Sequence, residues 1–270
     1  MRIPSKSILL AGLVFLATSF PVRACGYGVP NPFARFTQAE SVVVGKVTGF
    51  DGRMVSAALT AGAPAKQEFA VAEVEIMQAL KGAVGLTHLR IGFLPAENLQ
   101  VGQVGCFFLN PHFAEPFYLM PRGFGLPTWR DNNPGFDAEV KQYECWGNLL
   151  RDPNTALQSE NPEDRYLTAA LLLAEYRTFQ TGVHDKSRKM TPIDAELSKR
   201  ILLALADADW TNAGQGMPVL PAQLFAQLGV TRKEGWNTPE SHTGANYEAA
   251  AKKWLKDNAE TFRIKAYVRV

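Results

Sequence analysis

The sequence has few cysteines, little excess charge and only one strongly apolar segment, at its start. Three cysteines among 270 residues are too few for a small disulfide-rich fold or for a zinc module built from four thiolates. The 28 lysines and arginines nearly balance the 26 aspartates and glutamates, which argues against a nucleic-acid-binding protein. After the first 20 residues, no stretch is long and apolar enough to predict a membrane span. Hydrophobic residues make up 46% of the chain, so a disordered protein is also excluded.

Short motifs of common enzyme classes are missing as well. The sequence contains no Gly-x-Ser-x-Gly, no phosphate-binding loop and no His-Glu-x-x-His. Gly123-Phe124-Gly125 runs directly into Leu126-Pro127, so it cannot open a dinucleotide-binding helix and is typical of a turn. We therefore predict no catalytic residues and no cofactor. An enzyme whose site is assembled from distant residues remains an alternative.

The histidines do not form a metal-binding pattern. Zinc needs three or four protein ligands at short range, and the four histidines are far apart in sequence: His88, His112, His184 and His242. His112 and Glu115 are three residues apart, but Pro111 and Pro116 on either side of them favour a loop over a helical ligand pair. The sequence predicts no metal site.

The chain begins with the pattern of a secretory signal peptide. Arg2 and Lys6 precede a 13-residue apolar stretch, residues 8–20, and small residues stand near Ala24. We predict a signal peptide over residues 1–24, cleaved after Ala24, and a secreted or periplasmic protein; a buried N-terminal helix is the alternative. Removal of this segment takes three basic residues from the 28 and leaves 25 against 26 acidic ones, a formal charge of −1.

Cleavage after Ala24 would make Cys25 the first residue of the mature protein. A lipid anchor on Cys25 is one interpretation, although Arg23 does not suit the small, apolar context of lipidation. A disulfide is the other, because exported proteins fold in an oxidising compartment. Spacing alone does not identify the pairing: Cys106 is one possible partner of Cys25, and Cys145 is then either a buried thiol or itself the partner of Cys25 or Cys106.

The middle of the chain has strand-like patterns and the last part has helical ones. Short alternating or β-branched segments separated by glycine and proline predict five strands, within residues 41–47, 70–76, 89–93, 104–109 and 117–120. Such strands suit a small closed or nearly closed barrel. Asn161-Pro162 and Thr191-Pro192 predict two helix starts, and apolar residues recur at helical spacing after each of them. We expect an α+β protein with a β-barrel over residues 25–125, a linker over 126–160 and an α-helical domain over 161–270.

Three tryptophans raise the question of a binding surface. Trp254 lies on the apolar stripe of a predicted helix and is expected in the core. Trp210 and Trp236 flank loops rich in glycine and proline, where ligand binding and simple packing are both open.

Several segments resemble a known family when they are taken in order. They are Cys25, the run 39–47, Val74-Glu75-Ile76 before Leu80-Lys81-Gly82, Gly105-Cys106-Phe107 and Phe117-Tyr118-Leu119. Over about residues 25–120 this order resembles the netrin-like domain of tissue inhibitors of metalloproteinases. The helical half has no counterpart in those inhibitors, and the combination of the two resembles exported bacterial proteins that carry this domain. The resemblance implies an OB-like five-stranded barrel and a Cys25–Cys106 disulfide.

The resemblance also implies a function as a metalloprotease inhibitor. In those inhibitors the amine and carbonyl of the first cysteine bind the protease zinc and the next residue enters the substrate pocket, which here would be Cys25 and Gly26. The family has Cys-x-Cys at its start, whereas this chain has Cys25-Gly26-Tyr27. The main hypothesis is therefore an exported, non-catalytic binding or structural module with a protein partner such as an envelope component. Metalloprotease inhibition is the alternative.

Overall fold

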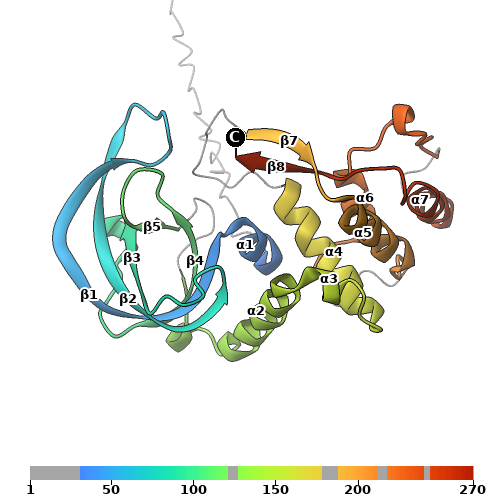
Figure 1. Cartoon of the computed structure of the whole chain (residues 1–270). Coiled ribbons are helices and arrows are strands. Elements are labelled where there is room, and N and C mark those ends of the chain that lie inside the picture. Colours follow the sequence, from blue (N-terminus) through green and yellow to red (C-terminus); the bar gives the residue numbers. More distant parts are fainter. Residues whose placement is uncertain (1–30, 121–126, 178–187, 212–217, 240–243, 270) are drawn as a thin grey trace, which may run out of the picture.

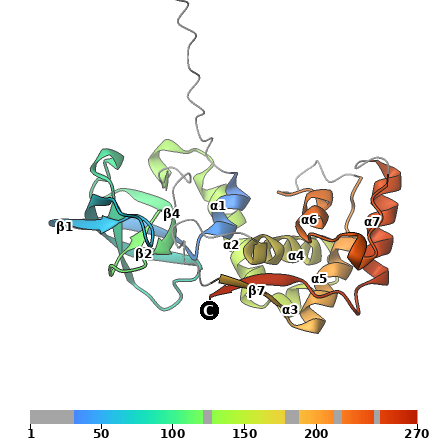
Figure 2. The same ribbon diagram turned by 90° about the horizontal axis from the view of Figure 1, so that it is seen from above.

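The computed structural model has a strand-rich half and a helical half, which lie side by side (Figures 1 and 2). It describes residues 31–120, 127–177, 188–211, 218–239 and 244–269. The predicted signal peptide, with Cys25 and Gly26, lies outside these residues. No helix in the described ranges combines the length and apolar character that crossing a bilayer requires. The mixed α+β class predicted from the sequence is confirmed.

Six strands form one sheet, and five of them close into a ring. They are β1 (Ser41–Ala58), β2 (Lys66–Lys81), β3 (His88–Phe93), β4 (Val104–Pro111), β5 (Tyr118–Leu119) and β6 (Thr128–Trp129). The order is β1-β2-β3-β5-β4-β6, and β1 also pairs with β4, from Ser41 opposite Leu109 to Lys46 opposite Val104. The five predicted strands all occur, and the pairing of β1 with β4 makes them a ring.

The hairpin of β1 and β2 is much longer than the sequence predicted. β1 has 18 residues and β2 has 16. Their register shifts at four places, where extra residues on one strand bend the pair. At Gly45 a Cβ atom would overlap the Val74 side chain, so glycine permits the close approach of the two strands. These bends let β1 pair with β2 on one side and with β4 on the other.

An apolar core fills the inside of the ring. Because side chains alternate across a strand, every second residue points inward. The inward set comes from all the main strands and includes Val43, Val47, Val74, Ile91, Phe107 and Leu109. The alternate residues Val42, Val44, Cys106 and Phe108 belong to a second core, which they share with the helices.

The helical half consists of α2 to α7 and a small hairpin. The helices are α2 (Phe136–Arg151), α3 (Pro153–Ala156), α4 (Pro162–Arg177), α5 (Ala195–Asp207), α6 (Pro221–Gln227) and α7 (Ala245–Asp257). The hairpin pairs β7 (Arg188–Pro192) with β8 (Lys265–Arg269). Short 3₁₀ turns occur at Pro95–Glu97, Arg130–Asn132 and Arg232–Glu234. An unpredicted helix, α1 (Pro32–Gln38), precedes β1 and packs against α4.

Two helix starts can be compared with their predictions. α4 begins at Pro162, as Asn161-Pro162 predicted. The prediction that a helix begins at Thr191-Pro192 is wrong, because both residues belong to β7. α5 begins at Ala195 instead, where the Asp194 carboxylate accepts a hydrogen bond from the Leu197 amide at 2.9 Å and caps the first turn.

Residues 126–160, which we expected to be a linker, hold most of the layer that joins the two halves. α2 lies within this range and buries Phe136, Tyr143 and Trp146 against α1 and the ring. The aromatic residues sit seven and three positions apart, which puts them on one helix face. The apolar core that results is continuous from the ring strands to α7.

Polar contacts also connect the ring to the helices. Lys81 of β2 forms an ion pair with Glu175 of α4 and donates to the Phe36 carbonyl at the end of α1 at 3.0 Å. The Arg35 guanidinium stacks on Phe108, 4.1 Å from the ring centre. The ring, α1 and α4 are thus held in a fixed relation.

Candidate functional site

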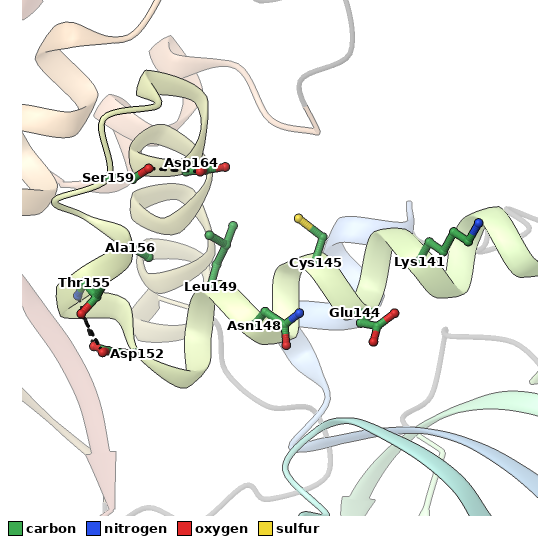
Figure 3. Close-up of a pocket in the computed structure, with 10 residues that line it drawn as sticks. All are labelled: Lys141, Glu144, Cys145, Asn148, Leu149, Asp152, Thr155, Ala156, Ser159 and Asp164. Atoms are coloured by element: carbon green, nitrogen blue, oxygen red, sulfur yellow. Dashed lines mark hydrogen bonds between the residues drawn. The ribbon is translucent and has the colours of Figure 1, made fainter.

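A groove of about 650 Å³ lies between α2, the short helix α3 and the start of α4 (Figure 3). We call it the α2–α4 groove. Its lining residues are mainly polar: Lys141, Glu144, Cys145, Asn148, Leu149, Asp152, Thr155, Ala156, Ser159 and Asp164. Most of them come from a segment that the sequence prediction placed in a linker.

Helix caps fix one wall of the groove. Asp152 ends α2 and caps α3, because its carboxylate accepts hydrogen bonds from the Thr155 amide at 3.1 Å and the Thr155 hydroxyl at 2.7 Å. Ser159 donates its hydroxyl proton to the Asp164 carboxylate at 3.1 Å. The carboxylates of this wall are therefore held in place before any ligand binds.

The opposite wall belongs to α2 and carries unpaired polar groups. The side chains of Lys141, Glu144 and Asn148 make no hydrogen bond or ion pair with any residue that the structure describes, and all three are exposed. Glu144, Asp152 and Asp164 give the groove three carboxylates against one lysine. It is equipped to bind polar or charged groups by hydrogen bonds and charge.

Cys145 lies on the wall of the groove and is a free, exposed thiol. Partial burial raises the pKa of this thiol, and the negative charges of Asp164 and Glu163 raise it further. A nucleophilic cysteine needs the opposite, a neighbouring cation that lowers the pKa and favours the thiolate. The pKa of Cys145 is thus shifted in the opposite direction from that of an activated nucleophile.

The structure also places His112 and Glu115. The His112 Nε2–H donates to the Ala58 carbonyl at 2.8 Å, and Nδ1 accepts the amides of Ala114 and Glu115 at 3.1 and 2.9 Å. Because both ring nitrogens are occupied by the backbone, His112 fastens the β4–β5 loop to the end of β1 and has no lone pair left for a metal. In the described parts of the chain, no three His, Cys, Asp or Glu side chains are placed to hold a metal ion. His184 and His242 lie outside those parts.

The predicted pairing of Cys25 with Cys106 is not supported. Cys106 is a free thiol on β4, it is only 1% exposed, and Cys25 is not among the described residues. Burial raises the pKa of Cys106 to about 12. The roles proposed for Cys25 and Gly26 in inhibition stay predictions.

The three tryptophans pack together. Phe225 of α6 lies at the centre of an aromatic cluster, with ring centres of Trp236, Trp254 and Trp210 at 4.7, 5.7 and 6.2 Å. The indole nitrogens of Trp210 and Trp254 donate to the carbonyls of Leu205 and Glu234. Trp254 is in the core, as predicted, and packing rather than ligand binding explains Trp210 and Trp236.

The groove itself was missed from the sequence. One signal was present. Lys141, Cys145 and Asn148 recur at helical spacing on the side of α2 opposite its aromatic residues, so α2 has one polar face.

A comparison with models of known protein families found no match, and a search of curated proteins found none.

Proposed function

We propose that the chain is an exported, non-catalytic binding module that holds its partner in the α2–α4 groove. The observation that carries this proposal is the chemical environment of the Cys145 thiol. Partial burial, followed by the charges of Asp164 and Glu163, raises the pKa of the thiol that the groove offers, and no histidine is among the described residues that line it. Fixed carboxylates and unpaired polar side chains favour recognition over chemistry.

We propose further that the ring of strands is an OB-like barrel of the netrin type. Its support is the double pairing of β1, which joins β2 and β4 and leaves no gap between the five main strands. A small barrel of this kind is filled by apolar side chains, as the inside of this ring is. In this proposal the barrel acts as a rigid support for the helices that form the groove.

The partner that we propose is a protein in the secreted or periplasmic compartment, such as an envelope component. Lys141, Glu144, Cys145 and Asn148 are exposed, so the groove is open along α2. Small-molecule sites bury most of their ligand, whereas an open polar groove suits a segment that protrudes from a larger molecule.

Protection of Cys145 from alkylation tests the proposal. The mature chain is mixed in turn with members of a panel of short peptides and cell-wall oligosaccharides, and the iodoacetamide modification of Cys145 is followed by peptide mass. A binder should slow the modification. Asn148→Arg, which fills the groove from an exposed position, should abolish the protection, whereas Gln142→Arg, an exposed α2 residue that does not line the groove, should not.

Two results would overturn the proposal. Protection that survives Asn148→Arg would place the partner elsewhere on the molecule. A substrate turnover that is lost in Cys145→Ser would show that the site is catalytic.

A further inference from the structure

The hairpin of β7 and β8 concentrates positive charge. Its ten residues include Arg188, Lys189, Lys265 and Arg269 and no aspartate or glutamate, although the whole chain is nearly balanced in charge. The register places Arg188 opposite Arg269. The positive charge of this segment favours an anionic partner.

The lysines of the hairpin are available to a partner. Lys189 and Lys265 are exposed, and neither forms an ion pair with the residues that the structure describes. Glu234 is close enough to interact with the charge of Lys265 but does not form an ion pair with it.

One edge of the hairpin is also open. Within the described residues, β7 pairs with β8 alone, and it is β8 that packs against α4. Figure 1 shows β7 on the outer side of β8, away from the helices. No described residue pairs with the far edge of β7, and the backbone groups of this edge, apart from Pro192, which has no N–H, are a template for another strand. A two-stranded sheet is marginal by itself, and a third strand stabilises it.

We propose that the free edge of β7 binds an extended, acidic polypeptide segment of a partner protein, which adds to the hairpin as a third strand. Backbone hydrogen bonds would supply affinity, and the cations of the hairpin would select carboxylate side chains. The five residues of β7 set the length of the segment at about five residues. This surface is separate from the α2–α4 groove and does not depend on it.

A second copy of this chain is a poor occupant of the same edge. Pairing β7 with β7 of another molecule would bring two sets of cations together without an acidic residue between them. The proposal therefore names a different, acidic protein.

Fluorescence anisotropy with a labelled peptide tests the proposal on the whole mature chain. The probe is a six-residue peptide of alternating glutamate and valine. We expect saturable binding that weakens as salt increases. The double variant Lys189→Glu and Lys265→Glu should lower the affinity about tenfold or more. Lys66→Glu, at an exposed position at the start of β2, should leave it unchanged. Thermal unfolding confirms that each variant is folded.

A peptide with the same sequence and alternate N-methyl groups separates strand addition from simple charge attraction. It keeps the carboxylates but cannot donate the backbone hydrogen bonds that one strand edge requires. Loss of binding supports strand addition. Equal binding of the N-methylated peptide, an equal loss in Lys66→Glu, or no binding of the unmodified peptide would overturn the proposal.

Discussion

Gly147 of α2 lies directly against Leu80 of β2. A Cβ atom at position 147 would overlap the Leu80 carbonyl oxygen, so only glycine allows the helix to approach the strand this closely. Helix propensity alone would favour alanine by about 1 kcal/mol. The overlap with Leu80 is expected to outweigh this gain in helix propensity, so a substitution at position 147 should lower the stability of the protein.

Gly147→Ala should destabilise the protein by about 2 kcal/mol or more, because α2 must move away from the ring and loosen the shared core. Gln142→Ala, on the exposed side of the same helix, is the matched control and should be neutral or slightly stabilising. Urea unfolding followed by tryptophan fluorescence measures both variants. A Gly147→Ala protein as stable as the control would show that the contact is not required.

Two buried tyrosines should respond in opposite ways to loss of their hydroxyl groups. The Tyr143 hydroxyl is enclosed among aromatic rings and has no hydrogen-bond partner within the described residues. The Tyr166 hydroxyl donates to the Val219 carbonyl. Tyr143→Phe should keep or raise the free energy of unfolding, by up to about 1 kcal/mol, whereas Tyr166→Phe should lower it by about 1–2 kcal/mol. Urea midpoints compare the pair, and a large loss in Tyr143→Phe would reveal a hidden partner of its hydroxyl.

The alkylation of Cys145 should depend on pH in a way that reports its neighbours. Burial and then Asp164 and Glu163 raise the thiol pKa, so the rate with iodoacetamide should reach its half-maximum at a higher pH than for a free cysteine. Asp164→Asn removes a negative charge and should move the profile to lower pH. Asp137→Asn, in the first turn of α2, should not move it. An unchanged profile in Asp164→Asn would contradict the electrostatic interpretation. Cys106 should stay unmodified until the protein unfolds.

Export can be tested by mass mapping of the non-reduced protein from a periplasmic or secreted fraction. We expect a chain that starts at Cys25, and the same map identifies a lipid on that residue or a Cys25–Cys106 bridge. An uncut chain recovered from the cytosol with three reduced cysteines would contradict the prediction of export.

The inhibitor alternative requires a free amine on Cys25. If it holds, the mature chain should inhibit a zinc metalloprotease, and one alanine added before Cys25 should abolish the inhibition, because the amine would no longer reach the metal. Inhibition that is unchanged by the extra alanine would exclude this mechanism.

The strands could be predicted because β-branched and alternating residues mark each of them locally. They suggested a closed or nearly closed barrel, but not which strands close it, since closure depends on the pairing of Ser41 with Leu109, which are far apart in sequence. The length of the β1–β2 hairpin was underestimated because bulges break the alternation of its residues.

The helices, like the strands, could be predicted only in part. Asn31-Pro32 starts α1 with the same pair of residues that starts α4, so α1 was within reach of the sequence. α2 was hidden because its buried face is aromatic and is interrupted by Gly147. The groove could not be predicted without α2, since its walls come from three helices whose packing is not encoded locally.

The core that Phe36, Phe108 and Trp146 share has a practical consequence for dissecting the protein. A fragment that stops near residue 125, where the sequence would place a boundary, would expose the apolar side of β4 and α1 to water. Such a fragment is expected to aggregate when it is expressed alone. Future truncations should keep α2 and α4 together with the strands.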